Sequence, residues 1–427
     1  MAKYYFATIR GKSAGYYAAV TALAVVASFW LIGSIVRFLM GYYITGMSHS
    51  VTWSADKVIF VLFVGLSAGS LLISGLAAIF GQTQFKVLSR VAAFNSILFM
   101  VGALLILISS WGRPDRIFLP FYNINPRSLL SLNAFIYSTY ITVGILYLWA
   151  LIKQNDKVAR ALGITAVVTA IFVHSGTGFI FGIINARELF FSPITPLAFV
   201  VAALSSGTAL AMLVLYFSFK FTNRQIDRRF FEFLSRVMLG LIFVVAFLVT
   251  IEHLTHLYVP EGQHAESFVM RNGGFYTFVF WVQFYLVGAI IPIVILLNKG
   301  TRNRIGWILV ASACHVVGVL GERILFILPG QVLAIPLMPG YELTSPFLDG
   351  VNVSYYPRLV EWAQIIGIFG LLALIYMLAI RILPLLPVQA DYIAPAAAHA
   401  EEEATEEEEE AAEEPEGAGP APAEEEE

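Results

Sequence analysis

The sequence predicts an all-α integral membrane protein with ten transmembrane helices. Of its 427 residues, 58% are hydrophobic, 14% are aromatic and only 13% are charged, whereas roughly a quarter of the residues in a soluble domain are charged. Ten apolar runs reach the length of about 20 residues that a helix needs to cross a bilayer. Connections rich in Lys and Arg alternate along the chain with connections poor in them, as they do in membrane proteins. These observations exclude a water-soluble globular protein.

The ten expected helices follow one another along most of the chain. The first apolar run comes after a basic N-terminus and lacks a small-residue cleavage site, so we expect a retained helix rather than a signal peptide. In chain order, the expected helices span residues 17–40, 58–80, 91–111, 129–152, 161–184, 194–219, 237–258, 275–297, 305–328 and 359–383.

Basic residues decide the expected orientation of these helices. One set of alternate connections holds 16 Lys and Arg residues, and the other set holds 7. Because cytoplasmic loops carry the excess of Lys and Arg, we expect the richer set to face the cytoplasm. Because the number of helices is even, both termini are then expected in the cytoplasm. We expect the protein to lie in the cytoplasmic membrane.

Short segments recur along the chain in the same order. Residues 66–70 (LSAGS) resemble residues 204–208 (LSSGT), and residues 88–91 (LSRV) recur at 234–237. The second segment of each pair lies four helices after the first. Because four is an even number, the two repeated units would cross the membrane in the same direction and have the same topology. We therefore expect helices 2–5 and helices 6–9 to form two repeated four-helix bundles, with helices 1 and 10 at the periphery.

The expected domain organisation follows from these bundles. A polytopic membrane domain would occupy residues 1–388: peripheral helix 1 and its loop at 17–57, the first bundle at 58–190, the second at 191–330, and an outer loop with helix 10 at 331–388. Residues 389–427 would form a disordered acidic cytoplasmic tail. From residue 391 onward the chain holds 16 acidic residues and no Lys or Arg, with hardly any large apolar residue to build a core.

Ionisable residues inside the expected helices are candidates for function, because burying such a group in a bilayer costs several kcal/mol. Helix 7 carries Glu252, His253 and His256, and helix 9 carries Glu322 and Arg323. Glu252 and His256 are four residues apart and share a helix face. We expect these five residues to line a proton path. The alternative is an architectural ion pair of Arg323 with Glu252 or Glu322.

Two histidines are expected near the middle of the membrane. His174 is followed by Ser175, Gly176, Thr177 and Gly178, which suit close approach of a ligand. His315 fits equally well as a hydrogen-bonding contact between helices. Gly65 and Gly69 are also compatible with simple helix packing.

The connection at residues 111–116 (WGRPDR) carries basic residues although it is expected to face outward. It contributes Arg113 and Arg116, and Arg127 follows shortly after. Such a cluster suits docking of an acidic partner or orientation of a ligand carbonyl. A surface pair between Asp115 and Arg116 is the simpler alternative.

These features together resemble the NrfD/PsrC family, the quinone-reactive membrane subunits of polysulfide reductase-like complexes, in the ten-helix form. The resemblance covers about residues 56–383. It rests on residues 65–69 (GLSAG), the 111–116 connection, His174 followed by residues 185–187 (NAR), and Pro196 with residues 205–207 (SSG). Many relatives have proline after the Ala-Arg pair, where this chain has Glu188.

The resemblance implies a subunit of a quinol oxidoreductase complex that is not catalytically complete alone. It would oxidise menaquinol, or reduce the quinone, near the outer membrane face within the first bundle. Menaquinone or ubiquinone would be an exchangeable substrate, with no tightly bound cofactor. The partners implied are a ferredoxin-like iron-sulfur subunit and other redox subunits, such as a multihaem cytochrome, a molybdenum enzyme or a heterodisulfide-reductase-like protein, but no nucleic acid. The single cysteine, Cys314, agrees with a chain that holds no cluster of its own.

Quinol oxidation releases two electrons and two protons, so a base must lie near the quinol hydroxyls. We expect Asp115 and His174 to be catalytic. The expected quinone-binding residues are Asp56, Ser67, Arg113, Asn133 and Tyr137.

Three other functions fit parts of the same sequence. A b-type cytochrome needs histidine pairs at matched depth, and His174 with His315 is the one pair that qualifies. A secondary transporter would explain an internal repeat and buried charges, although these repeats have the same orientation. A proton-pumping subunit without its own quinol chemistry would carry the same residues.

Overall fold

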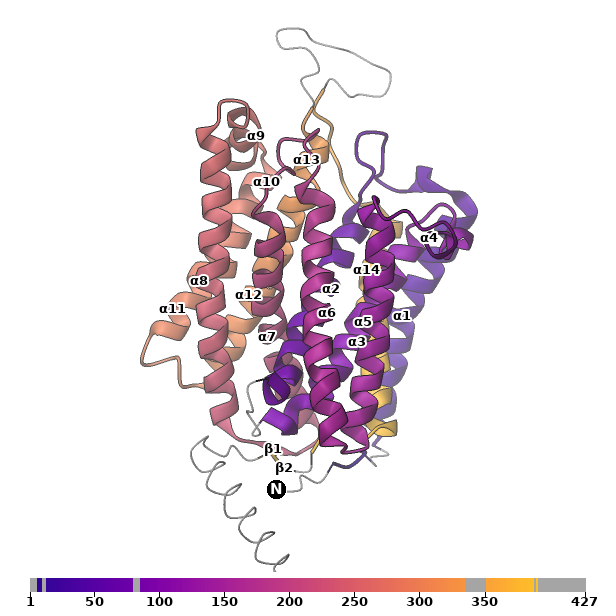
Figure 1. Cartoon of the computed structure of the whole chain (residues 1–427), viewed down its shortest axis with the longest axis vertical. Helices are drawn as coiled ribbons and strands as arrows, with labels where there is room; N and C mark the ends of the chain where they lie inside the picture. The colour runs from indigo at the N-terminus through magenta and orange to yellow at the C-terminus, as the bar shows by residue number, and fades with distance from the viewer. Residues whose placement is uncertain (1–5, 10–12, 80–84, 335–350, 388, 391–427) are drawn as a thin grey trace, which may run out of the picture.

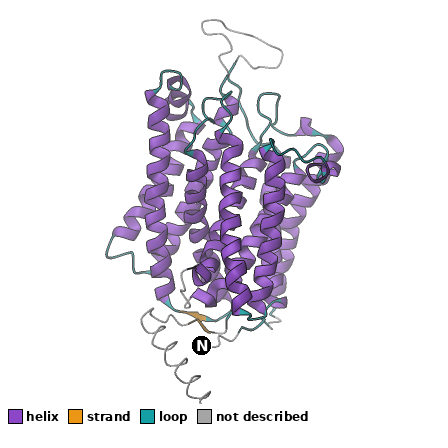
Figure 2. Cartoon of the chain, in the orientation of Figure 1, coloured by secondary structure: helices purple, strands orange, loops and turns teal. Residues whose placement is uncertain are grey.

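The structure is a computed structural model that describes residues 6–9, 13–79, 85–334, 351–387 and 389–390. Among these residues, ten helices are long and apolar enough to cross a membrane. They run side by side along the long axis of the molecule, with loops gathered at the two ends (Figures 1 and 2). The predicted all-α membrane fold with ten transmembrane helices is therefore confirmed.

The transmembrane helices have these bounds: α1 (Ala14–Met40), α2 (Ala55–Ile79), α3 (Lys86–Ser109), α5 (Leu129–Ile152), α6 (Asp156–Gly182), α7 (Thr195–Phe221), α8 (Arg228–Tyr258), the consecutive α10 (Phe275–Phe278), η5 (Val279–Ile290) and α11 (Ile291–Leu297), α12 (Ile305–Ile327) and α14 (Leu359–Ile382). Short elements at the helix ends are η1 (Tyr42–Ile44), η3 (Pro114–Arg116), α4 (Leu119–Tyr122), α9 (Gln263–Ser267), η4 (Phe268–Asn272) and α13 (Pro329–Val332). Two-residue strands β1 (Gln225–Ile226) and β2 (Gln389–Ala390) pair in parallel.

Several helices begin earlier than hydropathy predicts. Helix α6 begins at Asp156 rather than residue 161, and α8 begins at Arg228 rather than residue 237. The side chains of Asn155 and Asp227 cap these helices by accepting hydrogen bonds from backbone N–H groups of the first turn. Such polar caps begin a helix before its apolar part, so an apolar window misses the first turns.

The two described ends of the chain meet at one end of the bundle. Phe6 pairs with Pro387, and the Arg224 guanidinium donates to the carbonyl oxygens of Ala7 and Leu386 at 2.9 and 2.6 Å. We call this the N-terminal end. The opposite end carries α4, α9 and α13 (Figure 1), and we call it the α9 end.

Helix α2 lies at the centre of the bundle and contacts α3, α6 and α7. Helices α1 and α14 pack on each other and flank this centre. Contacts between helices link the members of each expected bundle. The first bundle contains α2, α3, α5 and α6, and the second contains α7, α8, η5 and α12. That these two groups repeat each other stays a prediction.

The closest crossing of α2 and α7 occurs where the two similar Leu-Ser segments meet. Gly69 and Gly207 face each other there, and a Cβ atom on either residue would overlap the backbone of the other. Gly65 lies one turn away, and a Cβ there would be 3.8 Å from the nearest atom, the Cα of Ala203. Gly69 is thus required for packing, and Gly65 is not.

We expect Gly69→Ala to destabilise the protein by about 1–3 kcal/mol, because the added methyl forces α2 and α7 apart. Gly65→Ala is the matched control and should be neutral or slightly stabilising, since its methyl fits and alanine favours helix. Unfolding midpoints of the two variants in one detergent measure the difference. Equal midpoints would contradict this packing.

The eighth transmembrane segment is one apolar run in the sequence, but it contains a π-helix in the structure. Gly274 precedes it with φ of 56°, and η5 then continues for 12 residues. The wide turns bring Gly288 against Gly318 of α12, where a Cβ would lie 2.6 Å from the Gly318 Cα. The acidic tail from residue 391, and residues 335–350 of the expected outer loop, lie outside the described residues.

Candidate functional site

His174 lies on α6 with its imidazole buried in the bundle; the residue is only 2% exposed. Its Nδ1 lies 2.9 Å from the Ala170 carbonyl oxygen. A carbonyl can only accept a hydrogen bond, so Nδ1 carries the hydrogen and Nε2 keeps a free lone pair. Nε2 is buried and has no hydrogen-bond partner among the described residues, although the Val64 backbone on α2 lies close to the ring. His174 therefore presents a free proton acceptor inside the membrane domain.

Two more predicted site residues lie on α5 and contact α6 within one turn of His174. The side-chain amide of Asn133 donates to the Gly176 carbonyl at 3.0 Å, while its Oδ1 is buried and unpartnered. The Tyr137 hydroxyl lies 2.8 Å from Oγ1 of Thr177, one turn along α6 from His174. The interface of α5 and α6 thus holds two of the predicted residues, Asn133 and Tyr137, within one turn of His174 along α6. Asn133 and His174 each have a buried polar atom without a partner among the described residues.

The small residues after His174 are used mainly for helix packing. A Cβ at Gly178 would lie 2.7 Å from the Pro196 Cα, and one at Gly182 would lie 2.7 Å from the Ser192 carbonyl oxygen. Gly176 instead faces the Asn133 side chain. The glycines therefore allow α6 to approach the start of α7, and only Gly176 adjoins a candidate site residue.

Asp56 is fully buried and belongs to a separate charge network at the α9 end. Its Oδ2 lies 2.8 Å from Nη1 of Arg37 and 3.5 Å from Nζ of Lys57, and the Ser54 hydroxyl also bonds its carboxylate. Arg37 donates further to Gln364 on α14 at 3.0 Å. These contacts join α1, α2 and α14, and they satisfy the Asp56 carboxylate within the protein.

The remaining predicted quinone contacts lie apart from His174. Ser67 is buried, donates to the Ser96 carbonyl at 2.7 Å and lies 2.9 Å from the Tyr140 hydroxyl. Arg113 and Asp115 are 65% and 58% exposed and share two hydrogen bonds of 3.0 and 2.9 Å. These bonds from Arg113 lower the pKa of the Asp115 carboxyl. The surface pair that forms is thus with Arg113 rather than with Arg116.

His315, the other histidine expected near the middle of the membrane, has a partner on both ring nitrogens. Its Nδ1 lies 2.7 Å from the Gly288 carbonyl oxygen and its Nε2 lies 2.9 Å from the Ser205 hydroxyl. These bonds tie α12 to η5 and α7. They also leave no nitrogen lone pair free for a haem iron.

Arg323 and Glu322 form a buried pair on α12. Nη1 of Arg323 donates to Oε1 of Glu322 at 3.3 Å, and the guanidinium lies over the Phe199 ring at 4.0 Å. Nε and Nη2 of Arg323 and Oε2 of Glu322 are buried without a partner. Arg323 is close enough to His174 to interact with it electrostatically. The pair therefore connects the second group of helices with the candidate site in the first.

The three ionisable residues on α8 continue from this pair toward the α9 end. Glu252 interacts electrostatically with Glu322 and accepts a hydrogen bond from Thr195 at 2.9 Å. His253 and His256 both contact Glu266 on α9, at 2.8 and 3.1 Å. The sequence analysis missed Glu266, because it lies in a polar connection outside the apolar runs. Burial opposes its ionisation, but the two imidazole contacts outweigh burial and lower the pKa of its carboxyl.

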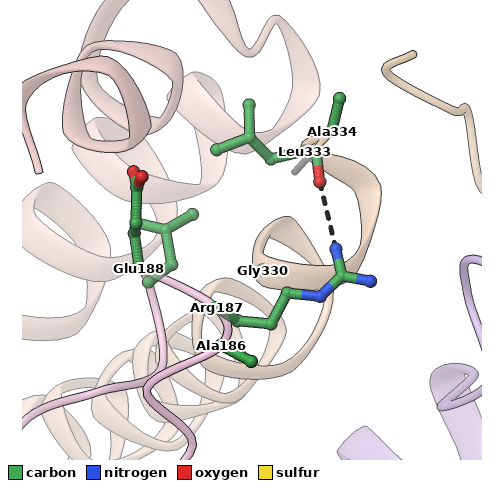
Figure 3. A pocket seen from close by; sticks show the side chains of 7 residues that line it. Ala186, Arg187, Glu188, Gly330, Leu333 and Ala334 are labelled. Atoms are coloured by element: carbon green, nitrogen blue, oxygen red, sulfur yellow. Dashed lines mark hydrogen bonds between the residues drawn. The ribbon is translucent and has the colours of Figure 1, made fainter. Parts of the chain in front are cut away.

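A small hollow lies beside Arg187 and Glu188, two residues that the family resemblance had singled out. Arg187 donates to the Leu333 carbonyl at 3.2 Å, and the Glu188 carboxylate points away from it (Figure 3). The hollow has a volume of about 30 Å³, whereas small-molecule sites measure roughly 300–1,000 Å³. It can hold water but not a quinone ring.

Known proteins similar to this chain are membrane subunits of redox complexes. The family described as "Polysulphide reductase, NrfD" matches residues 43–335. The "Hdr-like menaquinol oxidoreductase integral membrane subunit" of Archaeoglobus fulgidus is 36% identical over 389 residues, which cover 90% of this chain and 97% of that protein. A selenate reductase subunit of Mesobacillus selenatarsenatis is 26% identical, over 87% and 95% of the two chains. The "Menaquinone reductase, integral membrane subunit" of Nitratidesulfovibrio vulgaris is 23% identical, over 77% and 82%.

Proposed function

Because the chain belongs to the NrfD family of polysulphide reductase membrane subunits, we propose that it is the quinone-reactive membrane subunit of a multi-subunit oxidoreductase. In this proposal it oxidises menaquinol, or runs the reverse reaction, and exchanges electrons with an iron-sulfur partner subunit. Relatives named as a menaquinol oxidoreductase and a menaquinone reductase support the substrate class. The chain is then catalytically complete only together with its partners.

The observation that carries this proposal is the unpartnered Nε2 of His174. A quinol hydroxyl placed beside Nε2 would donate its proton there as the electrons leave, which is general base catalysis. Nδ1–H keeps its bond to the Ala170 carbonyl in both protonation states, so the ring need not turn. The free Oδ1 of Asn133 would accept a hydrogen bond from the ligand and help orient it. Both atoms are buried polar groups for which a ligand would supply the missing partner.

The proton route of the proposal leads from His174 to the α9 end. Arg323 interacts electrostatically with His174 and pairs with Glu322, and Glu322 interacts with Glu252. Arg323 stays protonated and holds the carboxylate in place, while Glu322 and Glu252 can bind and release protons. The α9 end would be the outer face, because, in the described part of the chain, the connections richer in basic residues lie at the other end (Figure 1).

In this proposal the exposed Arg113 and Asp115 belong to the surface that receives the partner subunit. Asp56 and Ser67 would act at the quinone site by holding α1, α2 and α3 around it rather than through free polar atoms. The quinone site itself would lie along α5 and α6, where Asn133 and Tyr137 contact α6 within one turn of His174.

Photolabelling with an azido-menaquinone in lipid nanodiscs tests the placement of the site. We expect adducts on α5 and α6 close to Asn133 and His174. Added menaquinone should compete with the probe and reduce the yield of these adducts. Adducts confined to α8 and α12 would contradict the placement. A reducible Soret band in the purified chain would instead favour a haem protein.

A further inference from the structure

The cluster of His253, His256 and Glu266 lies at the α9 end, beyond the half-buried Glu252. Glu266 is 1% exposed, whereas the His253 and His256 side chains are 18% and 20% exposed. The chain returns from α8 to α9 through a tight turn at Gly262, where a Cβ would lie 2.5 Å from the His256 carbonyl oxygen. This turn folds α9 back over the last turns of α8 and buries the Glu266 carboxylate between the two imidazoles.

The hydrogen bonds of His256 determine how many protons the cluster holds. Nε2 lies 3.1 Å from the Phe191 carbonyl oxygen, which only accepts, so Nε2 carries a hydrogen. Nδ1 lies 3.1 Å from Oε1 of Glu266. If neither atom of that contact held a proton, two lone pairs would face each other at this distance. One proton must therefore lie between Nδ1 and Oε1.

The carboxylate of Glu266 is the better place for the negative charge. Its second oxygen, Oε2, lies 2.8 Å from Nδ1 of His253, so two imidazoles can donate to one ionised group. Charge-assisted bonds of this kind are stronger than neutral ones. The proton in the contact with His256 is thus on the ring, and His256 is an imidazolium.

Other groups face the cluster from every neighbouring element. Glu252 on α8 interacts electrostatically with His256, and Tyr285 on η5 interacts with Glu266 while bonding Thr250 at 2.9 Å. The Phe280 ring meets His253 edge-on, with centroids 4.9 Å apart. His264 lies on α9 itself and is exposed. Glu252 therefore connects the cluster to the buried Glu322, and the partly exposed His256 connects it to the surface.

We propose that His256 and Glu266 form a proton-binding site that takes a proton from the Glu252 side and releases it to water at the α9 end. The bound proton sits on Nδ1 of His256, and Glu266 supplies the countercharge. No electron moves in this step. The inference rests on the proton route of the proposed function and adds Glu266, which nothing in the sequence marks, as the residue that positions the proton.

The first test measures the protonation of His256 in the full chain. Solid-state NMR with ¹⁵N-labelled histidine, in lipid nanodiscs at pH 7, reports the state of both ring nitrogens, and His256→Asn assigns the signal. We expect both nitrogens of His256 to be protonated in the wild type and one to be protonated in Glu266→Gln. A neutral His256 in the wild type at pH 7 would overturn the proposal.

The second test measures proton release from the assembled complex in proteoliposomes. After addition of menaquinol, a pH-sensitive dye on the α9 side should report release that is about tenfold slower in Glu266→Gln than in the wild type. Glu261→Gln is the matched control, because it makes the same change at an exposed position of the same connection, and it should behave as the wild type.

The two tests separate this inference from the proposed function. A wild-type complex without any menaquinol-dependent electron transfer would contradict the proposed function, while the NMR signal would still decide the state of His256. Normal electron transfer with equal proton release in Glu266→Gln and Glu261→Gln would contradict the inference alone.

Discussion

Replacing His174 with glutamine is expected to slow menaquinol-dependent electron transfer in the assembled complex by about 10²–10⁴-fold, the usual contribution of a positioned general base. Glutamine can still donate to the Ala170 carbonyl, but it offers no basic nitrogen where Nε2 lies. The substitution should lower kcat more than it changes the KM for menaquinol, because the removed interaction belongs to proton transfer. Rates measured at saturating menaquinol check this.

His264→Gln is the control for this variant, because His264 is an exposed histidine at the α9 end and should be replaceable without loss. Partner subunits that copurify in equal amounts with both variants show that assembly is intact. A fully active His174→Gln complex would mean that another group accepts the quinol proton.

Removing the Asp56 carboxylate should produce the largest loss of stability. Asp56→Ala leaves Arg37 buried beside Lys57 without a countercharge, and breaking a buried ion pair in this way costs about 3–5 kcal/mol. Denaturant unfolding in mixed micelles measures the loss. The double variant Arg37→Met/Asp56→Leu should recover part of it, because two apolar side chains replace the Arg37–Asp56 pair, while Lys57 keeps its hydrogen bond to Ser110.

The double variant also separates two roles of Asp56. If Asp56 acts only by holding α1, α2 and α14 together, a complex with the double variant should oxidise menaquinol at a rate close to that of the wild type. A stable double variant that no longer oxidises menaquinol would show that Asp56 contacts the quinone directly. A single Asp56→Ala variant as stable as the wild type would contradict the structural role itself.

Most of the fold could be predicted from the sequence because hydropathy reports the part of a helix that lies in lipid. The differences occur where other forces decide. Helix α8 begins nine residues before the prediction because Asp227 caps a charged first turn. The π-helix η5 leaves no mark in an apolar run, and neither does the close approach of Gly288 to Gly318.

The candidate site was predictable to the extent that ionisable residues stand out in apolar helices. Asn133 and Tyr137 contact α6 within one turn of His174, because α5 and α6 are consecutive antiparallel helices. That the three residues form one site stays a prediction. Glu266 was missed, since a glutamate in a polar loop looks solvated until the turn at Gly262 buries it. Arg37 was missed because its partner, Asp56, lies on the next helix, and such a pairing is visible only in three dimensions.

Chemical rescue of His174→Ala tests the central claim most directly. The assembled complex is mixed with excess menaquinol, and reduction of the redox centres in the partner subunits is followed in a single turnover, with and without added imidazole. The account predicts slow reduction in the variant, recovery toward the wild-type rate with imidazole, and no effect of imidazole on the wild type. Reduction at the full wild-type rate in His174→Ala without imidazole would contradict the claim that His174 is the base.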